Sequence, residues 1–119
     1  MKKTLVLGAS LKSNRYSNLA VNRLLDYNIT TKAFGLKSGT IRDVQISTKL
    51  HDFKNIHTIT LYVGRARQPK YYNEILKINP KRVIFNPGTE NPEFYKILKD
   101  KDIEVEVACT LVLLATNQY

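Results

Sequence analysis

The amino-acid sequence predicts an α/β protein of three layers, with helices on both faces of a mainly parallel, five-stranded sheet. Short apolar runs, such as residues 4–7 and 81–85, alternate with segments whose apolar residues recur at helical spacing, such as residues 20–25. Strands that alternate with helices along a whole chain favour a doubly wound parallel sheet. Since no linker, repeat or low-complexity segment interrupts the pattern, we expect residues 1–119 to form one domain.

The elements can be placed from local signals. The expected strands are residues 4–7, 29–34, 57–63, 81–85 and 103–107. The expected helices begin after residue 15, at Pro69, at Pro92 and near residue 108. Glu104 and Glu106 predict an edge position for the last strand, and Tyr71 is expected to pack in the core. Residues 44–46 are a candidate for a short edge strand in an otherwise irregular segment, 38–55. For the five main strands we expect the sheet order 3-2-1-4-5.

The composition excludes several classes of protein. The hydrophobic fraction of 43% and the charged fraction of 24% are ordinary for a globular protein. The first apolar run ends at Gly8, too early for a signal peptide, and no run is long enough for a membrane span, so we expect a cytoplasmic protein. The single cysteine excludes an internal disulfide. The net charge of +9 fits a polyphosphate ligand, nucleic acid, or simply solvated helix faces.

The segment after the first strand has the features of an anion-binding loop. Gly8, Ala9 and Ser10 form a small-residue turn that a ligand can approach closely, and a helix N-terminus with free N–H groups follows. Lys12 and Arg15 add two positive charges. The further glycines of a dinucleotide fingerprint and the Gly-Lys-Ser/Thr of a P-loop are both missing. The pattern therefore fits a phosphate site and also an ordinary strand-to-helix turn.

The ends of the other strands add charge to the same rim. In an open parallel sheet, ligands bind beyond the carboxyl ends of the strands, at the switch point. The residues after the first three strands supply five cations: Lys12, Arg15, Lys37, Arg65 and Arg67. These strand ends carry no carboxylate before Glu90. In NAD-binding folds an acidic residue near the end of the second strand binds the ribose hydroxyls. Lys37 stands near that position here, so NAD is disfavoured. A cation there fits the 2′-phosphate of NADP or the 3′-phosphate of coenzyme A (CoA).

Three motifs carry a resemblance to a known family. They are Gly8-Ala9-Ser10 followed by Arg15-Tyr16-Ser17, then Asn-Pro-Gly-Thr-Glu-Asn at residues 86–91, and then Ala108-Cys109-Thr110. In this order and spacing they resemble the small stand-alone CoA-binding domain family. That family has a Rossmann-like fold related to the CoA-binding domain of the succinyl-CoA synthetase alpha subunit. The resemblance covers nearly the whole chain, and it implies that CoA or an acyl-CoA is the ligand.

The resemblance also implies roles for individual segments. The loop at residues 8–10 and the helix start at residues 15–17 would hold the diphosphate. Lys37 would meet the 3′-phosphate or the ribose, residues 34–36 would lie near the adenine, and residues 86–88 would flank the pantetheine arm. The complete expected site consists of Gly8, Ala9, Ser10, Lys12, Arg15, Tyr16, Ser17, Phe34, Gly35, Leu36, Lys37, Tyr62, Val63, Gly64, Arg65, Asn86, Pro87 and Gly88.

The sequence contains no visible catalytic constellation: no triad, no paired carboxylates and no metal-ligand spacing. Cys109 is the one candidate nucleophile, and we expect it to be a buried apolar side chain. We therefore expect a non-catalytic CoA-binding protein that acts as a carrier, sensor or partner subunit, as a monomer or homodimer. The alternatives are an NADP-binding oxidoreductase-like domain and a basic nucleic-acid-binding module, although the aromatic residues do not form an open stacking face.

Overall fold

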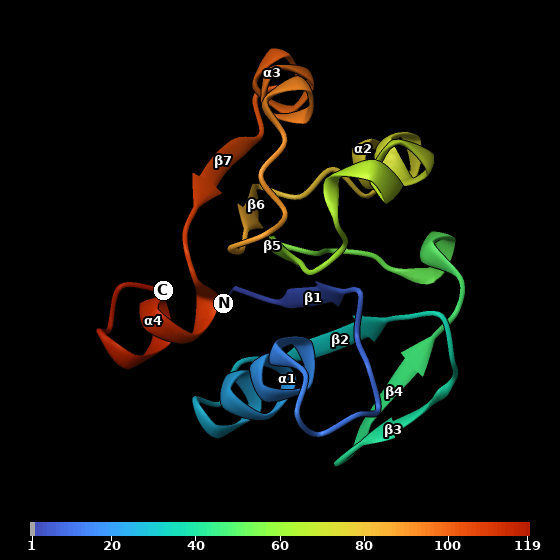
Figure 1. The fold of residues 1–119 in the computed structure, drawn as a ribbon, viewed down its shortest axis with the longest axis vertical. Helices are drawn as coiled ribbons and strands as arrows, with labels where there is room; N and C mark the ends of the chain where they lie inside the picture. Colours follow the sequence, from blue (N-terminus) through green and yellow to red (C-terminus); the bar gives the residue numbers. More distant parts are fainter. Residues whose placement is uncertain (1) are drawn as a thin grey trace.

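Residues 2–119 are described by a computed structural model, which has a three-layer α/β fold (Figure 1). The strands are β1 (Thr4–Leu7), β2 (Thr31–Phe34), β3 (Gly39–Ile41), β4 (Val44–Ser47), β5 (Thr58–Leu61), β6 (Arg82–Phe85) and β7 (Glu104–Val107). The α-helices are α1 (Tyr16–Asp26), α2 (Tyr72–Ile78), α3 (Pro92–Asp100) and α4 (Thr110–Ala115). The 3₁₀ turns are η1 (Leu50–Asp52), η2 (Arg65–Arg67) and η3 (Pro69–Tyr71). The seven strands form one sheet in the order β3-β4-β2-β1-β5-β6-β7.

Helices cover both faces of the sheet, as the sequence predicted (Figure 1). Alternate side chains of β1 point to opposite faces, because successive residues of a strand do so. Leu5 and Leu7 join the apolar cluster that includes α2 and α3, whereas Val6 joins the cluster that includes α1 and α4. β1, β5 and β6 are buried along their whole length. This is the expected pattern for parallel strands that are covered on both faces.

The expected strand number and strand order were wrong. The sheet has seven strands rather than five, because residues 39–47 form the antiparallel hairpin of β3 and β4. β4 pairs with β2 and takes the position beside β2 that the order 3-2-1-4-5 gave to the third main strand, and β3 forms the edge. That third strand, β5, pairs with β1 instead. The five main strands therefore follow the order 2-1-3-4-5, and the switch point lies between β1 and β5.

An unusual turn closes the β3–β4 hairpin. Arg42 and Asp43 form the turn, and Arg42 has a φ of 55°. Two-residue hairpin turns favour Asn-Gly or Asp-Gly, so this pair gave no hairpin signal in the sequence. Arg42 donates hydrogen bonds to Oδ1 of Asp26, at 2.7 Å, and to the main-chain oxygen of Asn22, at 3.1 Å. The hydrogen bond from Arg42 is the main cause that lowers the pKa of the Asp26 carboxyl. These contacts fasten the hairpin to the last turns of α1.

β6 begins with a buried arginine that joins several elements. The side chain of Arg82 is only 6% exposed and forms an ion pair with Glu106 of β7 at 3.1 Å. It also donates to Oγ1 of Thr58, at 3.1 Å, and to the main-chain oxygen of Tyr119, at 2.9 Å. Its guanidinium lies 4.5 Å from the centroid of the Tyr119 ring, a cation–π contact. Arg82 thus connects β5, β7 and Tyr119 at the amino edge of the sheet.

Replacing Arg82 with alanine is expected to lower the free energy of unfolding by about 2–4 kcal/mol, because polar groups at a buried position lose their partner. Urea denaturation followed by circular dichroism measures this change. Lys99→Ala, at an exposed position of α3, is the control and should change stability by less than about 0.5 kcal/mol. If the two variants were equally stable, the contacts of Arg82 would contribute no net stability.

Candidate functional site

A cavity of about 660 Å³ lies at the carboxyl edge of the sheet, beyond the ends of β1, β2 and β5 (Figure 1 shows the arrowheads of β1 and β2 at this edge). Its volume is typical of small-molecule sites. Most of the expected site residues line it: Gly8, Ala9, Ser10, Lys12, Arg15, Tyr16, Ser17, Phe34, Gly35, Leu36, Lys37, Tyr62 and Val63. The rest of the lining consists of Leu11, Arg67, Lys70 and Tyr71.

The turn after β1 is shaped by hydrogen bonds to the end of β2. The N–H groups of Gly8 and Ala9 both donate to the carbonyl oxygen of Phe34, at 2.9 and 2.8 Å. Gly8 has a φ of 104°, which glycine adopts without steric cost. A Cβ on Gly35 would lie 2.3 Å from the carbonyl oxygen of Ala9. The turn after β1 and the turn after β2 therefore pack directly against each other, because residue 35 has no side chain. Because the N–H groups of Gly8 and Ala9 are already paired with Phe34, they are not available to a ligand. These two residues shape the loop, and any free backbone donors must come from other residues.

The start of α1 supplies such donors. Within residues 2–119, the N–H groups of Ser10, Tyr16 and Ser17 have no hydrogen-bond acceptor. Arg15 is the N-cap residue, but its side chain makes no capping hydrogen bond, and the first turn of α1 contains no acidic residue. An uncapped helix N-terminus attracts anions through its free N–H groups and its dipole. The loop therefore presents an open anion position at the edge of the cavity.

Five cations line the cavity: Lys12, Arg15, Lys37, Arg67 and Lys70. None of them has an ion-pair partner among the residues that the structure describes. Among the side chains that the structure describes, no carboxylate belongs to the lining either. Lys70 was not among the expected site residues, because it falls in a segment that we expected to be an ordinary helix start. The positive charge is thus left unneutralised by the chain itself.

An apolar wall accompanies these charges. The rings of Phe34 and Tyr71 meet edge to face, with centroids 5.5 Å apart. Tyr71 packs against the core, as expected, and it also lines the cavity. Leu36 and Tyr16 also line the cavity although they are 74% and 71% exposed. Flat aromatic and aliphatic surfaces beside cations suit a heterocyclic base that is linked to phosphates.

Tyr62 is a partly buried tyrosine of the lining. It follows β5, lines the cavity and packs against the cluster that contains Leu114 of α4. Burial raises the pKa of Tyr62 to about 12. Its phenol therefore stays protonated near neutral pH, so Tyr62 is suited to donating a hydrogen bond rather than to acting as a general base.

The structure places the other expected site residues outside this lining: Gly64, Arg65, Asn86, Pro87 and Gly88. Asn86 is 2% exposed, and its side-chain nitrogen donates to Oγ1 of Thr60 and to the carbonyl oxygen of Leu61, at 2.7 and 3.0 Å. Its side-chain oxygen accepts a hydrogen bond from the N–H of Thr110, at 2.8 Å. Asn86 therefore joins β5, β6 and α4 in the interior. Cys109, which we expected to be buried, is partly exposed and does not line the cavity.

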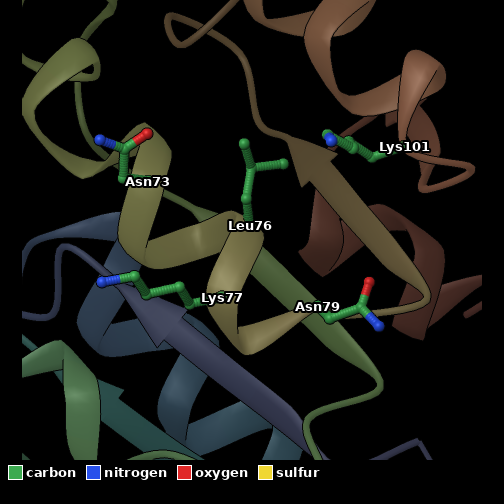
Figure 2. Close-up of a pocket in the computed structure, with 5 residues that line it drawn as sticks. All are labelled: Asn73, Leu76, Lys77, Asn79 and Lys101. Carbon is green, nitrogen blue, oxygen red and sulfur yellow. The ribbon is translucent and has the colours of Figure 1, made fainter.

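A second cavity, of about 410 Å³, lies at the opposite edge of the sheet. Asn73, Leu76 and Lys77 of α2 line it, together with Asn79 before β6 and Lys101 before β7. Figure 2 shows Lys77 and Asn79 pointing in opposite directions, so their polar ends do not converge. This cavity has neither the aromatic wall nor the helix N-terminus of the first.

Metal-binding clusters and membrane-spanning helices are both absent from the part of the chain that the structure describes. Within residues 2–119, no group of His, Cys, Asp and Glu side chains is placed to hold a metal ion. No helix in this range is long and apolar enough to cross a lipid bilayer. The titratable side chains that line the carboxyl-edge cavity are cations and tyrosines.

The fold and the position of the cavity define the class of protein. Doubly wound α/β proteins bind nucleotide-like ligands beyond the carboxyl ends of their strands, at the switch point. A family model described as "CoA binding domain" matches residues 2–115. The chain therefore belongs to the CoA-binding domain family, and the resemblance found in its motifs is confirmed. Membership of this family supports CoA binding in general. No curated protein matches the sequence.

Several solved structures share the fold. A crystal structure of an uncharacterized protein is 42% identical, with a TM-score of 0.97, and the match covers 100% of this chain and 98% of that one. A protein from Thermus thermophilus is 20% identical, with a TM-score of 0.87 and coverage of 99% and 91%. A hypothetical protein from Pyrococcus horikoshii OT3 is also 20% identical, with a TM-score of 0.88 and coverage of 98% and 83%. At 20% identity the last two show the fold alone.

The contact between the two turns can be tested with a pair of glycine substitutions. Gly35→Ala is expected to lower the free energy of unfolding by about 1–3 kcal/mol, because the new methyl group would force the Ala9 carbonyl away. Gly64→Ala is the matched control, since a Cβ at Gly64 would meet no atom within 4 Å. Thermal and urea denaturation of both variants measure the difference. Equal stability of the two variants would mean that the turns can separate without cost.

Proposed function

We propose that this protein binds CoA or an acyl-CoA, without catalysing a reaction, in the cavity at the carboxyl edge of its sheet. The family match over residues 2–115 carries this proposal. The cavity supports it independently, because its described lining combines cations without ion-pair partners, free N–H groups and an apolar wall, and includes no carboxylate. A ligand with several phosphates and an adenine matches each of these features.

The diphosphate fits best at the start of α1. The free N–H groups of Ser10, Tyr16 and Ser17 are rigid donors there, and Arg15 and Lys12 bring positive charge to the same loop. The small side chains at the turn let phosphate oxygens approach the backbone closely. We therefore assign the diphosphate to this loop.

The adenine fits the apolar wall that Phe34 and Tyr71 form, with Leu36 beside it. The exposed apolar surface of Leu36 would be covered by the base, which gives a hydrophobic contribution to binding. The pantetheine arm then runs along Tyr62 and Val63, which follow β5 and line the cavity.

A binding role, as carrier, sensor or partner subunit, agrees with the chemistry of the lining. The protonated lysines and arginines of the lining cannot act as a general base. Tyr62 also keeps its proton near neutral pH, because burial raises its pKa. Cys109 lies outside the lining. The side chains that surround the proposed ligand are therefore groups that bind and orient it.

NADP is the second candidate ligand, because Lys37 stands where a 2′-phosphate would be held. Isothermal titration calorimetry with CoA, acetyl-CoA and NADPH separates the candidates. Saturable binding of CoA that NADPH does not displace is the expected result. Tighter binding of NADPH would replace the proposal with the second candidate, and the absence of binding by folded protein would reject both.

Arg15 provides the direct test of the diphosphate position. Arg15→Ala should weaken CoA binding by about 1.5–3 kcal/mol, the loss typical of a charge-assisted hydrogen bond. The matched control is Arg23→Ala, which removes an exposed arginine at the other end of α1, where Arg23 pairs with Asp26 at 3.6 Å. Calorimetric dissociation constants should change for the first variant only. An unchanged constant for Arg15→Ala would remove Arg15 from the site.

A further inference from the structure

Four of the five cations of the cavity belong to two groups that enter from opposite faces of the sheet. Lys12 and Arg15 lie in the loop that leads into α1, and α1 packs on the face to which Val6 points. Arg67 and Lys70 lie in the 3₁₀ turns η2 and η3, which lead into α2 on the other face. The two groups therefore meet at the cavity from separate elements.

The second group borders the aromatic wall. Tyr71, the last residue of η3, meets Phe34 at the end of β2 with ring centroids 5.5 Å apart. Nζ of Lys70 lies 5.2 Å from the centroid of the Tyr71 ring. The contact between the two rings brings η3 to the end of β2, and Lys37 follows β2 and lines the same cavity. Three cations from two connections, Lys37, Arg67 and Lys70, thus line the same cavity as this apolar surface.

These three cations have no oppositely charged partner among the side chains that the structure describes. Like charges gathered at one site repel one another, and an anion with several oxygens relieves that repulsion while accepting hydrogen bonds from all three. The diphosphate, placed at the start of α1, leaves this position free.

We propose that Arg67 and Lys70, together with Lys37, hold the 3′-phosphate of CoA and make the protein selective for CoA over 3′-dephospho-CoA. This inference rests on the proposed function, since it assigns one phosphate of the same ligand. With the diphosphate at α1 and the adenine against Phe34 and Tyr71, the ribose between them carries its 3′-phosphate to the cations that border this wall. Arg67 offers a planar fork of donors and Lys70 a compact charge, a combination suited to a dianionic phosphate.

Calorimetric titration with two ligands tests the inference. CoA and 3′-dephospho-CoA differ only in the 3′-phosphate, so their dissociation constants isolate its contribution. The wild type should bind CoA at least about tenfold more tightly, the effect of one charge-assisted hydrogen bond or more. Lys70→Gln and Arg67→Gln should each weaken CoA binding by about tenfold and change the binding of 3′-dephospho-CoA by less than about twofold.

Lys99→Gln is the matched control, because it removes one exposed positive charge on α3, outside the cavity lining. It should leave both dissociation constants unchanged. If Lys70→Gln and Arg67→Gln weakened the binding of both ligands equally, the two side chains would contribute general electrostatic attraction only, and the inference would be overturned. Equal binding of the two ligands by the wild type would also overturn it, while the proposed function would stand. Binding of neither ligand by folded wild type would reject the proposed function itself.

Discussion

The carbonyl group of Phe34, at the end of β2, determines the direction of the chain as it leaves β1, the central strand of the sheet. Its oxygen accepts the N–H groups of both Gly8 and Ala9, so the end of β2 sets the direction of the turn after β1. The residue after Phe34 is a glycine, and the Ala9 carbonyl occupies the space that a side chain would need. Farther along, the side-chain amide of Asn18 donates to the carbonyl oxygen of Ser10, at 2.9 Å, which ties the loop to α1. The place of the α1 N-terminus beside the cavity follows from these contacts.

The two kinds of positive group in the cavity have different physical roles. Backbone N–H groups at the start of α1 are fixed in direction by the turn, so a phosphate that binds them costs little ordering of the protein. Lysine and arginine side chains are long and exposed, and they lose rotamer freedom when they bind. Their summed field attracts anions over longer distances and raises the rate of association. In the proposed complex, the fixed donors would position the diphosphate, and the cations would add attraction at a distance to their contacts with phosphate oxygens.

The loop is also supported from the β3–β4 hairpin, which the sequence did not predict. Leu11 lies so close to Gly39 of β3 that a Cβ there would be 2.7 Å from one of its methyl groups. The hairpin was missed because its turn has no glycine or asparagine, and because Arg42 stabilises the turn through a contact with Asp26 that is distant in sequence. Tertiary contacts of this kind leave no local signal.

Local signals predicted other elements well. β1 occupies residues 4–7 as expected, and the Asn91 side chain accepts the N–H of Phe94 as an N-cap. These features depend on residues that are neighbours in the sequence. Strand order instead depends on which strand of the growing sheet each new strand pairs with, and local sequence does not specify that. The sequence prediction therefore found the residues at the ends of β1, β2 and β5, but placed the end of β6 one strand too close to β1.

That displacement explains the place of the Asn-Pro-Gly-Thr-Glu-Asn motif at residues 86–91. Because β5 lies between β1 and β6, the residues after β6 face the connection that follows β5. Gln68 is fully buried there, and its side chain donates to the carbonyl oxygens of Val63 and Thr89, at 2.9 and 2.8 Å. Its own oxygen accepts from the Asn91 amide at 2.9 Å. Gln68 lies between η2 and η3, so the motif holds in place the segment that carries Arg67 and Lys70. The motif thus supports the cavity through the backbone that it fixes, although none of its residues belongs to the lining.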